Sequence, residues 1–197
     1  EVVRDPKTHR YSSSRGITGL RRAQAAYYGR RFGVDLDPDK EIIVTLGSKE
    51  GLANLATAVT SPGDVILVPN PSYPIHQFGF VIAGAVVRNV PVKPDEDFLS
   101  ALDRAVRHSV PKPTALVLNY PNNPTTELAS IDFYRDVVDF CRRHEIYIFS
   151  DLAYAEIYFD TPPPPSILQV AGAREIAVEF TSMSKTYSMP GWRIGFA

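Results

Sequence analysis

A short loop near the end of the chain places a lysine between residues that can bind an anion. Ser182 lies three residues before Lys185, and Arg193 lies eight residues after it. A lysine amine can bond covalently to a carbonyl carbon, while a serine hydroxyl and an arginine guanidinium can hold a phosphate group. The loop therefore predicts a Schiff-base site for a phosphorylated aldehyde, for which pyridoxal 5'-phosphate (PLP) is the candidate.

Other apolar runs of strand length also end in polar, turn-forming or aromatic residues. The segments that follow these runs are residues 47–51, 70–74, 119–125 and 151–154. In open α/β sheets, ligands bind at the carboxyl ends of the strands. We therefore expect these segments and the lysine loop to converge on one site at one edge of a sheet.

Two of these segments suit the charged ends of such a cofactor. Ser48 and Lys49 follow Gly47 where a strand turns into a helix, and free N–H groups at a helix start favour an anion. A plain turn with a serine cap explains the same residues. Asp151 follows an apolar strand and, opposite a pyridine nitrogen, would keep that nitrogen protonated. A helix cap or a salt bridge with an arginine is its alternative role.

Three further residues suit a flat heteroaromatic ring. Tyr73 lies between two prolines, which restrict the backbone around a side chain that can stack. Asn123 and Tyr154 can each donate a hydrogen bond to a phenolic oxygen, which lowers the basicity of a Schiff-base nitrogen. A core or surface tyrosine is the alternative for Tyr73, and a bond within its own Pro-Asn-Asn-Pro turn is the alternative for Asn123.

Apolar runs of strand length alternate along the chain with helical patterns. The expected strands are residues 42–46, 65–69, 85–90, 115–119, 146–150, 176–180 and 194 onward. Helical spacing occurs at 20–27, at 52–59 and after Ser130, a candidate N-cap. Several strands are apolar at nearly every position, as in strands covered on both faces. The alternation predicts an α/β fold with three layers, α/β/α, around a mostly parallel seven-stranded sheet.

Composition limits the kinds of partner. The chain has 197 residues, of which 44% are hydrophobic, and a net charge of −1. This near-neutral charge argues against a nucleic-acid or membrane-surface role, because both call for a basic patch. The densest basic cluster, Arg21-Arg22 with Arg30-Arg31, is interpreted as the solvated face of one helix. No apolar run is long enough to span a membrane, and we expect a cytoplasmic location.

The cysteine and the histidines suggest no metal site. Cys141 is the only cysteine and falls on the apolar face of a helix, so a buried, inert thiol is expected. The histidines lie far apart in the sequence, none at metal-ligand spacing, and are interpreted as structural or exposed. They are His9, His76, His108 and His144.

The ordered motifs G-S-K-E-G, N-P-x-Y-P, N-Y-P-x-N-P-T, D-x-A-Y, S-x-S-K and G-W-R-I-G resemble those of the fold-type I aminotransferases. The chain is most similar to the bacterial glutamate–pyruvate (alanine) aminotransferase branch, close to the LL-diaminopimelate aminotransferases, and residues 11–17 also match that branch. The resemblance runs through essentially the whole chain and implies the PLP-binding large domain. Thr126 departs from the glycine that many relatives carry there, which implies a local change in the loop.

The resemblance also implies a role for each matching residue. Lys185 corresponds to the Schiff-base lysine, Asp151 to the partner of the pyridinium nitrogen, and Tyr73 to the residue that stacks on the ring. Asn123 and Tyr154 match the contacts of the phenolic oxygen. The residues matched to the phosphate site are Ser48, Lys49, Ser182, Ser184 and Arg193. Tyr11 matches a tyrosine that reaches the phosphate of the neighbouring subunit, which implies a homodimer with shared sites.

Family members are much longer than this chain. We therefore expect residues 1–197 to be a PLP-binding large domain without the N-terminal segment and the C-terminal small domain. The arginine that binds the substrate carboxylate is expected beyond Ala197, and the isolated fragment is expected to be inactive.

The sequence leaves the reaction partly open. The leading interpretation is transfer of an amino group between an amino acid and a 2-oxo acid, of the alanine/glutamate type. The same residues would serve a β-lyase, a decarboxylase or a racemase, and an aminotransferase-like sensor domain of a transcription regulator is a further alternative. A degenerate domain without cofactor conflicts with the presence of both Lys185 and Asp151.

Overall fold

A computed structural model describes residues 1–92 and 97–197 of the chain. The strands are β1 (Val44–Thr45), β2 (Val65–Asn70), β3 (Val86–Pro91), β4 (Pro113–Asn119), β5 (Tyr147–Asp151), β6 (Ala177–Ser182) and β7 (Gly195–Phe196). The α-helices are α1 (Thr18–Phe32), α2 (Ser48–Val59), α3 (Ile75–Ile82), α4 (Phe98–Arg107), α5 (Ile131–His144) and α6 (Met183–Thr186).

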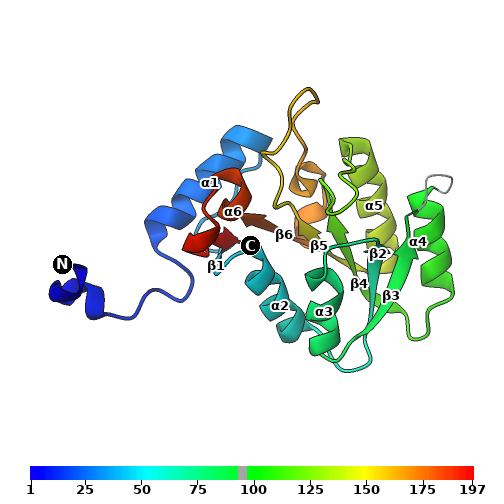
Figure 1. The fold of residues 1–197 in the computed structure, drawn as a ribbon. Coiled ribbons are helices and arrows are strands. Elements are labelled where there is room, and N and C mark those ends of the chain that lie inside the picture. The colour runs from blue at the N-terminus through cyan, green and yellow to red at the C-terminus, as the bar shows by residue number, and fades with distance from the viewer. Residues whose placement is uncertain (93–96) are drawn as a thin grey trace.

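The strands form one sheet in the order β1-β7-β6-β5-β4-β2-β3. Strands β2 to β6 pair in parallel, whereas β7 pairs antiparallel with both β6 and β1. Helices α2 and α3 cover one face of the sheet, and α1, α4 and α5 cover the other (Figure 1). The predicted three-layer α/β fold with a mostly parallel seven-stranded sheet is confirmed.

Alternating side chains of the central strands build the core on both faces of the sheet. Leu116 and Leu118 of β4 join the cluster under α4 and α5. Ala115 and Val117 of the same strand join the cluster under α2 and α3. Because side chains of a strand point alternately to opposite faces, an apolar strand of this kind needs cover on both sides. This double cover explains the continuous apolar runs in the sequence.

Helix α5 begins and lies as the sequence predicts. The Ser130 hydroxyl accepts a hydrogen bond of 3.0 Å from the Phe133 N–H, which makes Ser130 the N-cap. Cys141 of this helix is fully buried, and burial raises the pKa of its thiol to about 12. The thiolate is therefore disfavoured at neutral pH, in agreement with the prediction of an inert cysteine.

The interpretation of four arginines as one solvated helix face is wrong for two of them. Arg22 and Arg30 of α1 are exposed, but Arg21 is only 8% exposed and Arg31 is half-buried. Arg31 lies ten residues after Arg21, about 80° around the helix, and the side chains of both bind other parts of the protein. Their partners come from segments distant in sequence, which residue spacing alone does not reveal.

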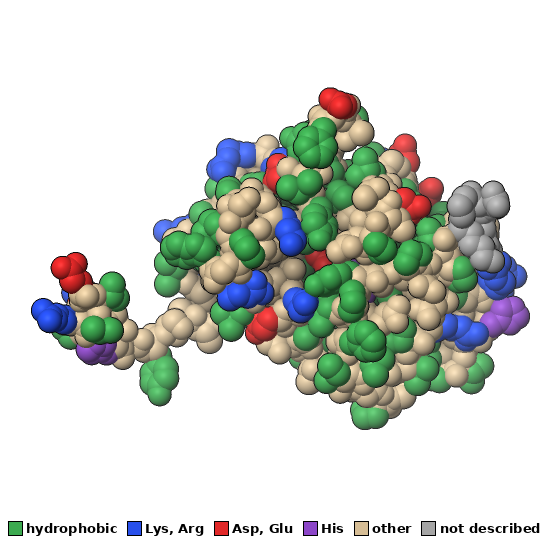
Figure 2. Space-filling model, viewed as in Figure 1, with side chains coloured by type: hydrophobic (Ala, Val, Ile, Leu, Met, Phe, Trp, Pro, Cys, Tyr) green, Lys and Arg blue, Asp and Glu red, His purple; other side chains and the backbone are tan. Residues whose placement is uncertain are grey.

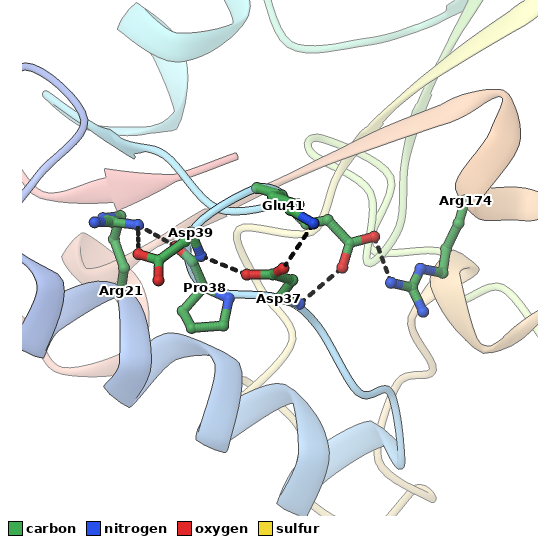
Figure 3. A network of polar contacts seen from close by, with 7 residues as sticks. Arg21, Asp37, Pro38, Asp39, Glu41 and Arg174 are labelled. Carbon is green, nitrogen blue, oxygen red and sulfur yellow. Dashed lines mark hydrogen bonds and ion pairs between the residues drawn. The ribbon is translucent and has the colours of Figure 1, made fainter.

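Arg21 belongs to a polar network that fastens the segment before β1 (Figure 3). Its Nη1 donates to Asp39 Oδ1 at 2.7 Å and to the Pro38 carbonyl. Glu41 accepts from the Asp37 N–H at 2.7 Å and from Arg174, which lies in the short helix η4 (Ala173–Glu175). The network therefore links α1 to η4 through the segment that leads into β1, the edge strand next to β7.

Strand β1 is shorter than predicted, since only Val44 and Thr45 of the run 42–46 pair with β7. Ahead of α1, the chain forms two short 3₁₀ helices, Val2–Arg4 and Pro6–His9, in an arm that extends away from the body of the molecule (Figure 1). Among the helices of the described residues, none is long and apolar enough to cross a membrane.

Candidate active site

The strand ends converge on one open cleft of about 290 Å³. All the predicted site residues except Tyr11 line this cleft. Figure 2 shows Lys and Arg side chains gathered around a hollow between α2 and α6, with an acidic side chain inside it. The residues that line the cleft are Gly47, Ser48, Lys49, Tyr73, Asn119, Asn123, Asp151, Ala153, Tyr154, Ser182, Ser184, Lys185, Pro190 and Arg193.

One end of the cleft is built for an anion. Helix α2 begins at Ser48 with no side chain capping its first turn, so its first N–H groups have no partner within the helix. Gly47 has φ = +91°, and a Cβ there would lie 2.5 Å from Arg193 Nη2. A Cβ on Gly195 would lie 2.6 Å from the Ser48 nitrogen. Two glycines therefore let the backbone, the helix start and a guanidinium approach one another.

Backbone contacts hold Arg193 at this end of the cleft. Its Nη1 donates to the Pro190 carbonyl at 2.8 Å, and its Nη2 donates to the Leu46 carbonyl at 3.2 Å. Among the residues that the structure describes, no carboxylate forms an ion pair with Arg193, Lys49 or Lys185. The cleft therefore carries positive charge that an anionic ligand can neutralise.

The lysine loop lines one side of the cleft. Ser182 ends β6 and caps α6, since its hydroxyl accepts from the Ser184 N–H at 3.2 Å. Lys185 follows on α6, and its Nζ lies 5.8 Å from the centre of the Tyr154 ring. Lys49 Nζ lies 5.1 Å from the centre of the Tyr73 ring. The two lysines thus stand beside two tyrosine rings around the space that a flat ligand would occupy.

Asp151 lies on the floor of the cleft and is 6% exposed. Its Oδ2 is 3.0 Å from Nε2 of His76, a residue of α3 that is 1% exposed, and its Oδ1 accepts from the Ala153 N–H. The sequence predicted a cap or an arginine partner as the alternatives for this carboxylate and missed the histidine. His76 lies three residues after Tyr73, which also faces the site, and this spacing is the sequence signal that could have revealed the histidine.

A second missed residue, Asn119, ties two site segments together. Its Nδ2 donates to the Asp151 carbonyl at 2.9 Å, and its Oδ1 accepts from the Asn123 N–H at 3.0 Å. Asn119 thereby holds the Asn123 backbone, so the Asn123 side chain is free to donate to the Tyr154 hydroxyl at 3.3 Å. The purely local turn bond considered for the Asn123 side chain is not the contact observed.

A buried carboxylate fastens β6 behind the cleft. Glu179 accepts hydrogen bonds from the hydroxyls of Tyr28, Ser150 and Ser166 and from the Ile167 N–H. Complete burial raises the pKa of Glu179, and these donors oppose that rise by stabilising its charged form. The contacts join α1 and β5 to β6, at the residue before Asp151 in β5 and three residues before Ser182 in β6.

Tyr11 does not join the cleft of its own chain. It lies between the 3₁₀ helix Pro6–His9 and α1 and is fully exposed to solvent. Its predicted role in a neighbouring subunit concerns a second chain and therefore stays a prediction.

Residues 2–197 match the family described as Aminotransferase class I and II. The protein named AatC from Rhizobium meliloti (strain 1021) is 66% identical over 197 residues, which is the whole chain and 49% of AatC. Glutamate-pyruvate aminotransferase AlaC from Escherichia coli (strain K12) is 52% identical over 99% of the chain and 47% of AlaC. LL-diaminopimelate aminotransferase from Aquifex aeolicus (strain VF5) is 45% identical over the whole chain and 51% of that protein.

The fold of the chain also matches solved structures. BacF from Bacillus subtilis, solved with bound substrate, superimposes with a TM-score of 0.89 at 35% identity, over 99% of the chain and 49% of BacF. The chain spans about half the length of the relatives that it matches. The match of nearly every residue, with named aminotransferases of the expected branch among the relatives, shows that the chain belongs to the class I and II aminotransferase family.

Proposed function

We propose that this chain is the cofactor-binding part of a PLP-dependent enzyme that transfers an amino group between an amino acid and a 2-oxo acid. The observation that carries the proposal is the convergence of Lys185, Asp151 and Arg193, from three separate segments, on one cleft with an anion site at one end. Membership of the aminotransferase family supports the same reaction.

The residues at the anion site fit a phosphate monoester. Ser48 and Lys49 would offer N–H groups at the start of α2, and Ser182 and Ser184 would offer hydroxyls. Arg193 would add a charge-assisted contact of about 1.5–3 kcal/mol. The close packing of Gly47 against Arg193, where a Cβ would intrude, supports this fit.

The middle of the cleft fits a pyridine ring with a phenolic oxygen. PLP, when bound, supplies an electron sink for the electron pair left when a bond at the substrate Cα breaks. Tyr73 would stack on the ring, and Asn123 and Tyr154 would donate hydrogen bonds to the phenolic oxygen. The Asp151 carboxylate would hold a proton at the ring nitrogen, with His76 keeping that carboxylate in place at 3.0 Å.

Lys185 would both anchor the cofactor covalently and move the proton at the substrate Cα. Its amine would act as a general base when it is not bonded to the cofactor, and α6 places it in the lining of the cleft. No other lysine than Lys49 and Lys185 lines the cleft within the described part of the chain, and Lys49 stands at the phosphate end. Lys185 is therefore the residue to which we assign the covalent role.

We assign the alanine/glutamate pair as substrates because AlaC, named a glutamate-pyruvate aminotransferase, shares 52% of the aligned residues. The proposal extends to a homodimer in which Tyr11 reaches the phosphate of the neighbouring site. It also extends to residues 1–197 as the large domain of a longer protein, since relatives are about twice as long. The cytoplasmic location expected from the sequence stays a prediction, and cell fractionation tests it.

Transfer of isotopic nitrogen tests the proposed reaction. The purified full-length protein that contains this chain, saturated with PLP, is given ¹⁵N-alanine and 2-oxoglutarate, and products are followed by NMR. We expect the label to pass to glutamate while alanine becomes pyruvate, so that the amino group is conserved. Release of ¹⁵N-ammonia with no labelled glutamate would contradict the proposal and favour a lyase. Release of carbon dioxide would favour a decarboxylase, and binding of PLP with no reaction of any amino acid would favour a sensor domain.

A further inference from the structure

Arg31 of α1 holds both ends of the loop that follows Tyr154. Its Nη2 lies 3.3 Å from the Ala155 carbonyl and 3.2 Å from the Pro164 carbonyl, and donates to both. Its Nε donates to Glu156 Oε1 at 2.8 Å. One guanidinium thus binds three acceptors that are more than 120 residues away along the chain, at the two ends of residues 155–164.

The surroundings of Arg31 keep this contact in one geometry. The guanidinium carbon lies 4.6 Å from the centre of the Phe32 ring and 5.8 Å from the centre of the Tyr158 ring. The Tyr27 hydroxyl donates to the same Glu156 oxygen at 2.5 Å, and burial together with this bond raises the pKa of Tyr27. The Arg31 and Glu156 side chains are 19% and 22% exposed, so water screens their ion pair only partly.

The fastened loop begins directly after Tyr154. The Ile157 N–H donates to the Tyr154 carbonyl at 3.0 Å, so Tyr154 sits inside the turn that opens the loop. On its cleft side, the Tyr154 hydroxyl accepts from Asn123, and Lys185 is the charged group that faces its ring. The rest of the loop has few anchors of its own, since Ile157 and Phe159 are 45% and 87% exposed.

We infer that Arg31 is a positioning residue for Tyr154. The inference rests on the proposed function, in which the Tyr154 hydroxyl donates to the phenolic oxygen of PLP. By binding the carbonyl one residue after Tyr154 and the carboxylate two residues after it, Arg31 fixes the turn that aims the hydroxyl. Arg31 does not line the cleft and would act only through its contacts with the Ala155 carbonyl and the Glu156 carboxylate.

Displacement of the Tyr154 hydroxyl should change how the visible absorbance of the PLP-loaded protein depends on pH. In the PLP-loaded protein, the hydrogen bond from this hydroxyl would stabilise the negatively charged phenolic oxygen. It would thereby lower the pH at which the Schiff-base nitrogen loses its proton. Loss of Arg31 should weaken that bond and raise the midpoint pH of the visible absorbance band. The expected rise is about 0.5–1 pH unit, the size of effect that one weakened hydrogen bond to a charged group produces.

The test compares Arg31→Gln with Arg30→Gln in the PLP-loaded protein. Arg30 is the matched control, because it immediately precedes Arg31 in α1 and is exposed. Within the described part of the chain it has no hydrogen bond or ion pair. Tyr154→Phe and the double variant with Arg31→Gln complete a double-mutant cycle. Arg31→Lys keeps the charge but not the planar fork, and replaces Arg31→Gln if the latter does not fold.

We expect Arg31→Gln to raise the midpoint while Arg30→Gln leaves it at the wild-type value. In the Tyr154→Phe background, Arg31→Gln should add no further shift, because the hydroxyl through which it acts is gone. An equal midpoint for the two arginine variants, or a shift that persists without the Tyr154 hydroxyl, would overturn the inference. A wild-type protein without any visible PLP band would instead overturn the proposed function itself, and the inference with it.

Hydrogen exchange gives a second readout that needs no cofactor. The amides of residues 154–160 should exchange faster in Arg31→Gln than in Arg30→Gln, because the loop loses the contacts at both of its ends. Unchanged protection of these amides would show that Arg31 does not hold the loop and would contradict the inference on its own.

Discussion

Asp151 is the residue on which the proposed chemistry depends most, because a proton at the ring nitrogen is what makes the ring an electron sink. The structure gives this carboxylate a buried position, a backbone N–H donor and His76 as a partner at 3.0 Å. A buried carboxylate without partners would be costly, so these contacts are what allow it to stand on the floor of the cleft.

Replacing Asp151 with asparagine keeps the shape of the side chain and removes its charge. We expect kcat to fall by at least about 100-fold while PLP still binds through its phosphate. Steady-state rates of the full-length protein at saturating PLP measure the effect, and Asp136→Asn, an exposed position of α5, is the control. A kcat for Asp151→Asn equal to that of the control would show that the charge has no part in the reaction.

The sequence revealed the site residues that follow apolar strands, but it did not reveal the important residues that lie elsewhere in the chain. Asp151, Asn123 and Lys185 stand at strand ends, where a parallel sheet brings its ligands together. His76 was missed because α3 was not among the predicted helices, and its partner Asp151 lies 75 residues further on. Arg31 was taken as solvated because a helical arginine shows no sign of a distant carbonyl.

Among the secondary-structure elements, the β1–α2 turn has the tightest geometry in the site. Gly47 and Gly63 share φ = +91°, but a Cβ on Gly63 meets nothing within 4 Å, whereas a Cβ on Gly47 meets Arg193. The two positions therefore separate backbone strain from the clash at the anion site.

Gly47→Ala and Gly63→Ala should each lower the free energy of unfolding by about 1–3 kcal/mol through backbone strain. Only Gly47→Ala should also weaken PLP binding, since the added methyl group displaces the Arg193 guanidinium. Urea unfolding and PLP titration measure the two effects. If both variants bind PLP like the wild type, the glycine at the start of α2 does not shape the phosphate site.

The polar network before β1 should make the free energy of unfolding depend on pH in the acidic range. Contacts from Arg174 and from the Asp37 N–H lower the pKa of Glu41 below its usual value of 4.5. A carboxyl group with a lowered folded pKa stabilises the protein above its unfolded pKa, and this contribution is lost as the pH falls through the folded value.

We therefore expect Glu41→Gln to unfold more easily than wild type at pH 7, with the difference shrinking below about pH 4.5. Urea unfolding across this range measures it. Glu127→Gln is the control, because its exposed side chain makes no hydrogen bond or ion pair among the residues described. A difference between wild type and Glu41→Gln that stays constant with pH would contradict the assignment.

Most strands, their mostly parallel arrangement and several helices were predictable from the sequence, whereas the order of the strands in the sheet was not. Apolar runs such as residues 115–118 predict strands covered on both faces, and Ser130 predicts the start of α5 correctly. Helix α4 and the antiparallel pairing of β1 with β7 were not predicted. Strand direction depends on contacts between segments about 150 residues apart, which leave no local pattern.

At the scale of the whole molecule, the chain carries nearly all residues of the proposed cofactor site, and one matched residue, Tyr11, lies outside the cleft. Because Tyr11 is fully exposed, we predict that it contacts a second copy of the chain. In a closed dimer of this kind each site would be completed by its neighbour.

A hybrid dimer of Tyr11→Phe and Lys185→Ala subunits tests the shared site. Tyr11→Phe homodimers should bind PLP roughly 10–100-fold more weakly, through the loss of one hydrogen bond to a charged group. In the purified hybrid, the site with Lys185 receives an intact Tyr11 from its neighbour, so its visible band should titrate with wild-type affinity. If the hybrid instead binds PLP as weakly as the Tyr11→Phe homodimer, Tyr11 does not contribute to the neighbouring site. It would then act in the site of its own subunit or in neither site.

The most direct test of the account is the identity of the lysine that bonds to the cofactor. The PLP-loaded protein is reduced with borohydride, digested and analysed by mass spectrometry, with Lys49→Ala and Lys185→Ala in parallel. We expect a reduced adduct on Lys185 in wild type and in Lys49→Ala, and neither adduct nor visible band in Lys185→Ala. An adduct on another lysine, or a band that survives in Lys185→Ala, would contradict it.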